Sequence, residues 1–363
     1  MQVGNVKNLK QTKNKEIMKK LFRLLLFIVL LSTVMFSCQN KDIDFPDFEY
    51  TTTYFPYQYP VRTLVLGDYY FDNENDNNRR FAISATMGGV YENKKDQLVD
   101  FVIDESLVQD MYIGNQRILP LPSQYYQLSD NSRIVIPKGQ LSGSVYVQLT
   151  EAFFNDPNAL GPAGTVYVVP VRITNSTTDS VLLGKSVVTN PDYRISEDWE
   201  IAPKNYTLFG INYINEYHGN YLLRGKSTQE KIGGGTSAET IVYRTRDVET
   251  DRVIGVSTTA RNTVTYTKEV ARSTTQSPGS FTMLITFDGN GNGQITTNPG
   301  SAFPVAGTAK FVKDSESWGG KARSAIYLDY TVDDGTYLNT AKDTLVFRDK
   351  GVYFQEFTPV YKP

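Results

Sequence analysis

The chain has 363 residues, a formal net charge of −2, 24 Tyr, 19 Phe and six Met. Residues 1–37 hold seven basic side chains and one acidic one, so the remainder carries a net charge of −8, from 30 basic and 38 acidic side chains. This acidic balance disfavours nucleic acid and anionic membrane surfaces as partners. One histidine and one cysteine also leave too few ligands for a His/Cys zinc centre.

The first 37 residues are predicted to be a secretory signal peptide. Lys19, Lys20 and Arg23 precede an apolar run over 24–36, which is shorter than the roughly 20 residues of a membrane span. A single transmembrane anchor is the alternative interpretation. The residues before Met18 lengthen the cationic region beyond its normal size, so we expect Met18 to be the true start.

Cys38 is predicted to be a lipid attachment point. It ends the stretch "VMFSC", which resembles a bacterial lipoprotein box, in which the cysteine thiol is lipidated and becomes the mature N-terminus. A lone cysteine cannot form a disulfide within its own chain. Residues 38–50 are interpreted as an acidic tether that resembles the export tags of Bacteroidetes surface lipoproteins. We therefore expect an outer-membrane protein, lipid-anchored and facing the cell exterior, that contacts the membrane through the anchor alone.

The remaining sequence predicts an all-β protein with two domains. Short runs rich in Val, Tyr and Thr, separated by turn residues, predict an immunoglobulin-like β-sandwich over 51–190. The Pro-rich and charged segment 190–204 is the predicted boundary. About eight further strands with hairpin turns over 204–363 predict a lipocalin-like β-barrel.

Both halves also resemble a known family. "VPVRITNSTTDSVLLG" and "LGDYYFDNENDNNRRFAISATMGGVYENKKD" are similar to the Ig-like N-terminal domain of Bacteroidetes surface lipoproteins of unknown function. "LFGINYINEYHGNYLLRG" and "DTLVFRDKGVYFQEFTP" resemble the β-barrel domain that follows it there. The resemblance implies a role beside SusC/SusD-like polysaccharide-utilisation systems, and it brings no catalytic residues.

The sequence offers little support for an enzyme. A Ser-His-Asp triad would need His218, which no nucleophile motif accompanies, so we interpret His218 as a structural or turn residue. Paired carboxylates for a glycoside hydrolase do not stand out from the many turn acids. "DGNGNG", Asp288–Gly293, matches half of a calcium loop but has Pro299 where a bidentate Glu belongs, which favours a hairpin turn. We predict no metal and no cofactor.

Aromatic side chains are the best candidates for binding, because sugar C–H faces stack on flat rings. Trp318 is predicted to lie in an exposed loop beside two glycines, and Trp199 is expected to pack between the domains. Tyr213, Tyr217 and His218 are further candidates, lining either the barrel mouth or its core.

The sequence-based hypothesis is non-catalytic glycan binding that supports polysaccharide capture and uptake, with SusC/SusD-like outer-membrane proteins as partners. A structural or adhesin component of an outer-membrane complex is the main alternative. A glycoside hydrolase is the weaker one.

Overall fold

The computed structural model describes residues 18–22, 47–160, 167–272 and 276–363. Cys38 and almost all of the predicted signal peptide and tether lie outside these ranges. Residues 48–363 form one compact unit, and residues 1–47 belong to another. Within the described ranges, no helix has the length and apolar character needed to cross a membrane.

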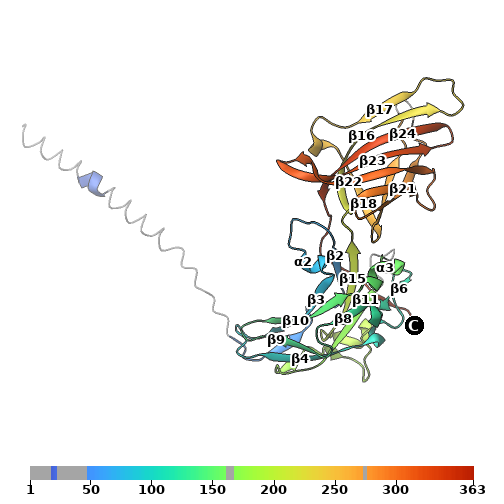
Figure 1. Ribbon diagram of the computed structural model, residues 1–363. Coiled ribbons are helices and arrows are strands. Elements are labelled where there is room, and N and C mark those ends of the chain that lie inside the picture. Colours follow the sequence, from blue (N-terminus) through green and yellow to red (C-terminus); the bar gives the residue numbers. More distant parts are fainter. Residues whose placement is uncertain (1–17, 23–46, 161–166, 273–275) are drawn as a thin grey trace, which may run out of the picture. The chain divides into compact units, whose positions relative to one another are not determined.

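The first half is built on two large β-sheets (Figure 1). The smaller sheet has five strands, in the order β12 (Ser180–Val181), β1 (Thr52–Tyr54), β3 (Arg80–Gly88), β10 (Ser142–Leu149) and β8 (Tyr126–Leu128). The larger sheet has the order β25 (Gln355–Glu356), β2 (Pro60–Val65), β15 (Tyr206–Ile214), β11 (Tyr167–Ser176), β4 (Gln97–Ile103) and β9 (Arg133–Ile136), with β7 (Leu119–Pro120) beside β11. Most pairs are antiparallel, but β1–β12, β2–β15 and β7–β11 are parallel.

The two sheets share one hydrophobic core, as a sandwich requires. Strand β10 alternates exposed and buried residues along its whole length, so its inner face contributes a row of apolar side chains. Ile83 and Val145 of the smaller sheet belong to the same buried cluster as Val99 and Ile173 of the larger one. Each such side chain contributes about 1.5–3 kcal/mol through burial. The predicted two-sheet architecture of this half is confirmed.

Short elements connect these strands. Their bounds are α2 (Glu74–Asn77), α3 (Glu151–Asn155), η1 (Glu105–Val108), η2 (Ser123–Tyr125), η3 (Pro157–Leu160), η4 (Ser196–Asp198), β5 (Met111–Ile113), β6 (Gln116–Arg117), β13 (Lys185–Ser186), β14 (Trp199–Ile201) and β26 (Val360–Tyr361). β13 pairs with β14, and β5 pairs with both β6 and β26.

The second half is a closed antiparallel barrel (Figure 1). Its strands are β16 (Gly219–Lys231), β17 (Glu239–Tyr243), β18 (Arg252–Ala260), β19 (Thr263–Glu269), β20 (Ser280–Phe287), β21 (Asn292–Thr297), β22 (Val305–Trp318), β23 (Lys321–Asp333) and β24 (Tyr337–Asp349). The short helix η5 (Val248–Thr250) connects β17 to β18. β18 to β24 pair in chain order, and β16 closes the barrel by pairing with β18 and β24. β17 adds to the far end of β16. The predicted barrel is thereby confirmed.

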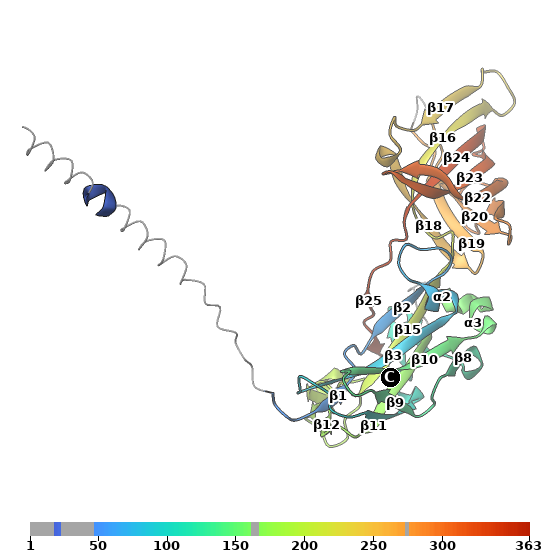
Figure 2. The same cartoon turned by 60° about the vertical axis from the view of Figure 1, so that its left-hand side comes forward.

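The chain enters the barrel later than the sequence indicated. Tyr206–Ile214 forms β15, which lies between β2 and β11 in the larger sheet, so the first barrel strand begins at Gly219. β15 is buried on both faces, as a central strand must be, and its apolar run does not show which sheet it joins. The chain later returns to this sheet, where β25 pairs with β2 (Figure 2).

Candidate functional site

A cleft of about 820 Å³ lies in the first half, beneath the returning C-terminal segment. It is built from segments far apart in the sequence, namely the residues before β2, the segment around η4 and β14, the start of β15 and the last residues of the chain. Its aromatic lining residues are Tyr59, Tyr193, Trp199, Tyr206, Phe357 and Tyr361. The volume is within the range of small-molecule sites, about 300–1,000 Å³.

Four of the aromatic rings form a connected series along the cleft. Trp199 lies 5.4 Å from Tyr193, which meets Tyr206 edge-on at 5.2 Å. Tyr206 in turn meets Tyr59 at 6.1 Å between ring centroids. Tyr206 is only 6% exposed, whereas Trp199 and Tyr193 are half-buried, so one end of the series forms the floor and the other presents ring surface.

Hydrogen bonds hold these rings in place. The indole N–H of Trp199 donates to the carbonyl of Asp192 at 2.9 Å, and the Asn205 amide donates to the Tyr193 hydroxyl at 3.1 Å. The hydroxyls of Tyr59 and Tyr206 lie 2.6 Å apart. Burial raises the pKa of both tyrosines, so they stay neutral at physiological pH.

Arg194 is fixed at the side of the cleft. Its guanidinium donates to both oxygens of Asp192, with the Nη2–Oδ2 bond at 2.6 Å, and to the carbonyl of Gln109 at 2.8 Å. The hydrogen bond from Arg194 lowers the pKa of Asp192, so this pair remains charged. The guanidinium also lies 4.3 Å from the ring centroid of Tyr361. Arg194 therefore positions a ring that the C-terminal segment supplies.

The C-terminal segment forms one wall of the cleft. Backbone pairing of its two short strands, β25 and β26, holds the segment in place. Glu356 pairs with Pro60, and Val360 pairs with Tyr112. The Phe357 amide donates to the Tyr59 carbonyl at 3.0 Å, and Phe357 is buried in the small core beneath the cleft. Exposed Glu197 and Glu356 add carboxylates to the cleft, each able to accept hydrogen bonds from ligand hydroxyls.

The sequence-predicted binding residues occupy other places. Tyr213 is 1% exposed in the core of the first half, with its ring 5.0 Å from Phe154. Tyr217 is buried in the barrel and stacks on Phe287 at 3.9 Å. Neither ring lines the aromatic cleft, because both complete hydrophobic cores.

His218 and Trp318 have structural partners in the barrel. His218 Nδ1 accepts the backbone N–H of Thr258 at 3.1 Å, and burial lowers the pKa of His218 to about 4, with a smaller effect from Lys350. Trp318 ends strand β22 instead of lying in a loop, and its indole donates to the Phe347 carbonyl at 2.9 Å. Its exposed neighbours Gly319 and Gly320 form the hairpin turn that the sequence interpretation took for a loop.

Trp199 also differs from its expected role. The sequence placed it at a domain boundary, but its ring packs on Tyr193 and lines the cleft. Sequence reasoning missed Tyr193, Arg194 and Tyr361 as site residues. The available signal was the concentration of Tyr, Arg and Trp in a Pro-rich segment, together with aromatics in the last residues.

The half calcium loop Asp288–Gly293 has internal partners. The carboxylate of Asp288 accepts the backbone N–H groups of Asn290 and Asn292, each at 2.8 Å, as in the predicted hairpin turn. In the acidic loop that follows β2, the buried Asp76 forms an ion pair with Arg62. The described residues contain no cluster of three or more His, Cys, Asp or Glu that could hold a metal.

The barrel interior is packed, and it contains a chain of polar groups. Asp343 accepts the ammonium of Lys268 at 2.6 Å and the hydroxyl of Tyr330 at 2.8 Å, and it also accepts the hydroxyl of Tyr243. Burial lowers the pKa of Lys268, an effect that Asp343 partly offsets. A void of about 10 Å³ beside Lys268 is near the volume that one water centre needs.

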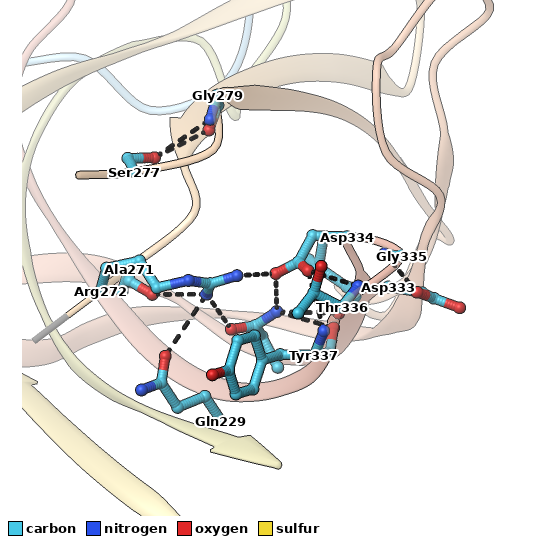
Figure 3. A network of polar contacts seen from close by, with 12 residues as sticks. Gln229, Ala271, Arg272, Ser277, Gly279, Asp333, Asp334, Gly335, Thr336 and Tyr337 are labelled. Carbon is cyan, nitrogen blue, oxygen red and sulfur yellow. Dashed lines mark hydrogen bonds and ion pairs between the residues drawn. The ribbon is translucent and has the colours of Figure 1, made fainter. Parts of the chain in front are cut away.

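A second polar network lies where strands β23 and β24 meet (Figure 3). Arg272 forms an ion pair with Asp334 and donates to Asn339 at 2.9 Å and to Gln229 at 3.4 Å. Asn339 donates to Asp334 at 2.9 Å. Burial alone would raise the pKa of Asp334, but the hydrogen bonds from Arg272 and its neighbours lower it. These groups satisfy one another, so the network secures this part of the barrel.

Two family models match the chain. One, described as a domain of unknown function (DUF5627), covers residues 216–351, which include every barrel strand. The other, described as an N-terminal domain, covers residues 48–180. No match was found among curated proteins.

The solved structures include a strongly similar protein. The chain is 37% identical to a Bacteroides ovatus protein of unknown function, over 87% of this chain and 100% of that one, with a TM-score of 0.79. The chain belongs to the family of that protein.

Two other solved structures are less similar to this chain. A Bacteroides ovatus multidomain protein that includes DUF1735 is 12% identical over 82% of this chain and 95% of that one, with a TM-score of 0.41. A Bacteroides thetaiotaomicron auxiliary nutrient binding protein is 13% identical over 79% and 90% of the two chains, with a TM-score of 0.34. Similarity at these levels carries no argument about function.

Proposed function

We propose that the protein is a non-catalytic glycan-binding surface lipoprotein and that the aromatic cleft is its binding site. One observation carries the proposal: an open cleft of about 820 Å³ that combines fixed aromatic rings with polar side chains. Trp199 and Tyr193 offer half-exposed ring faces to sugar C–H groups. Glu197 and Glu356 offer hydrogen-bond acceptors to sugar hydroxyls.

The charges of the cleft favour an uncharged glycan. The Arg194 guanidinium is already neutralised by the bidentate bond to Asp192. The exposed carboxylates of Glu197 and Glu356 then leave the cleft with a negative balance, which repels acidic sugars. We therefore propose neutral polysaccharide fragments as the ligands.

The location and partners form part of the same proposal. The predicted lipidation of Cys38 would hold the protein at the outer membrane. There it would pass captured glycan to SusC/SusD-like proteins, in keeping with the family resemblance of both halves.

The test is isothermal titration calorimetry of residues 48–363 against a panel of neutral oligosaccharides. We expect binding that Trp199→Ala weakens by about tenfold, because a ring-stacking contact contributes about 0.5–1.5 kcal/mol in addition to the apolar area that it buries. Tyr353→Ala is the matched control, because Tyr353 is 70% exposed and does not line the cleft. No binding across the panel, or equal binding by both variants, would contradict the proposal.

The same panel also tests the non-catalytic part of the proposal. Each oligosaccharide is incubated with the protein and its reducing ends are measured. We expect no increase over the protein-free sample. Sugar release at a rate that follows protein concentration would instead establish a hydrolase.

A further inference from the structure

A second hollow, of about 200 Å³, lies at one end of the barrel and differs from the aromatic cleft in its charges. Strands β22 and β23 supply half of its lining residues, and Phe347 of β24 and Lys350 just after it add two more. The loop after β2 and Glu216, between β15 and β16, supply the rest. Its charged lining residues are Asp68, Glu216, Lys313, Asp314, Arg323 and Lys350. Three of these side chains are acids and three are cations.

Arg323 is a cation without an acidic partner in this hollow. Among the residues that the structure describes, no carboxylate lies within 4.0 Å of its guanidinium, and its buried Nε has no hydrogen-bond partner. The guanidinium lies 4.1 Å from the ring centroid of Trp318, which holds its plane in place. A fixed, half-buried guanidinium with free donors is a preorganised anion site, because its fork matches the oxygens of a carboxylate or sulfate.

Lys350 is the second such cation. Lys350 is 2% exposed, its ammonium donates to the carbonyl of Glu216 at 2.6 Å, and the described residues place no carboxylate within ion-pair distance of it. Burial lowers the pKa of Lys350 to about 8, which leaves it mainly protonated at pH 7. A buried ammonium that contacts only carbonyls and a ring gains from a nearby anion.

Lys313 has a different role, because two acids already neutralise it. Its ammonium lies 2.7 Å from Asp68 and 3.0 Å from Glu216. These acids act on Lys350 at longer range, but their charge is shared with Lys313. The three acids of the hollow, which include Asp314, balance its three cations in number, but neither Arg323 nor Lys350 has a carboxylate within ion-pair distance.

The walls of the hollow suit a sugar ring attached to the anionic group. Tyr69 and Tyr70 lie 4.5 Å apart on one side, and Phe311 lies on the barrel side. The volume of about 200 Å³ is below that of a site for a larger molecule, so it suits one monosaccharide unit.

We propose that this hollow binds a sugar unit bearing a carboxylate or sulfate group, with the anion held by Arg323 and Lys350. The proposal goes beyond the proposed function, because it assigns a second site of opposite charge preference at the barrel. It stands whether or not the aromatic cleft binds neutral glycan.

The experiment uses residues 48–363 and three probes: tetragalacturonate, its fully methyl-esterified form, and a sulfated galactose disaccharide. We expect calorimetry to detect binding of at least one of the two anionic probes and not of the ester. Comparison of the uronate with the sulfated probe identifies which anion the site takes. Failure of both anionic probes, or equal binding of the ester, overturns the proposal.

Variants then locate the binding. Arg323→Gln should weaken the anionic probe at least tenfold, and Arg323→Lys should weaken it less, because lysine keeps the charge but loses the fork. Arg246→Gln is the matched control, since Arg246 is exposed and lies outside the hollow. Trp199→Ala should leave this binding unchanged. Thermal unfolding checks that Arg323→Gln is folded. If Trp199→Ala loses binding of the anionic probe and folded Arg323→Gln keeps it, the assignment to this hollow is overturned. That result would leave the proposal of a neutral-glycan site untouched.

Discussion

Replacement of Asp343 by asparagine should strongly destabilise the barrel. The side chain of Asp343 is fully buried, and that of its ion-pair partner Lys268 is 10% exposed. Asparagine keeps the size of the side chain but removes the charge that Lys268, Tyr243 and Tyr330 share. The ammonium of Lys268 is then left in the barrel interior without a counter-ion.

The expected loss is about 3–5 kcal/mol, the usual cost of removing one member of a buried ion pair. That is a large part of a total free energy of unfolding of roughly 5–15 kcal/mol. With a urea m-value of about 2 kcal/mol/M, the unfolding midpoint should fall by about 2 M. Asp343→Asn should also become relatively more stable as the pH rises, because the unpaired Lys268 loses its proton at lower pH in the folded than in the unfolded state.

Urea titration of residues 48–363, followed by circular dichroism, measures the change. The control is Asp329→Asn, which breaks the exposed ion pair between Asp329 and Lys342. The side chain of Asp329 is 53% exposed and that of Lys342 is 63% exposed. That pair should contribute less than about 1 kcal/mol. A second comparison uses the double variant Lys268→Met/Asp343→Asn, which also removes the unpaired charge of Lys268. This variant should recover part of the lost free energy of unfolding. Equal midpoints for Asp343→Asn and Asp329→Asn would refute the reasoning.

Three further predictions concern stability and the cleft. The folded-state pKa of His218 is about 4 and its ordinary value is 6.5, so acidification from pH 6.5 to 4 should remove up to about 3 kcal/mol of stability that His218→Asn does not lose. Since this is the sole histidine in the sequence, its NMR titration gives the pKa directly, and a value near 6.5 would contradict the prediction. Gly225→Ala should cost about 1–3 kcal/mol in thermal unfolding, because its Cβ would lie 2.4 Å from Asp343 Oδ1, whereas Gly255→Ala, with open space around it, should be nearly neutral. Deletion of residues 355–363 should abolish glycan binding in the cleft, while the barrel still unfolds cooperatively. Retained binding would contradict a role of the C-terminal segment in the binding site.

The sequence predicted the elements well, because alternation of polar and apolar residues is a local property. The run "SGSVYVQL" alternates in the sequence, and β10 alternates between exposed and buried in the structure. The sequence of a barrel strand likewise indicates which of its side chains face the interior. Lys268 follows Val264 and Tyr266 at every second position, so its strand places this charge on the inner face.

The aromatic cleft could not be predicted in the same way. Tyr193 and Tyr361 meet there because β26 pairs with β5 and Arg194 lies against Tyr361. Which strand edge a two-residue strand joins is decided by tertiary packing and not by its own residues. The same limit applies to β15, whose apolar sequence fits a sheet centre but does not specify the sheet.

The return of the C-terminal segment has a consequence for biosynthesis. The strands of the first half surround the barrel strands in chain order, since β15 precedes β16 and β25 follows β24. A ribosome must therefore finish the barrel before it releases the residues that complete the cleft. Until then Phe357 is absent from its place against Tyr59, and the small core beneath the cleft is exposed. An incomplete chain would present a fully formed barrel but an incomplete aromatic cleft, and its exposed apolar residues would make it prone to aggregation.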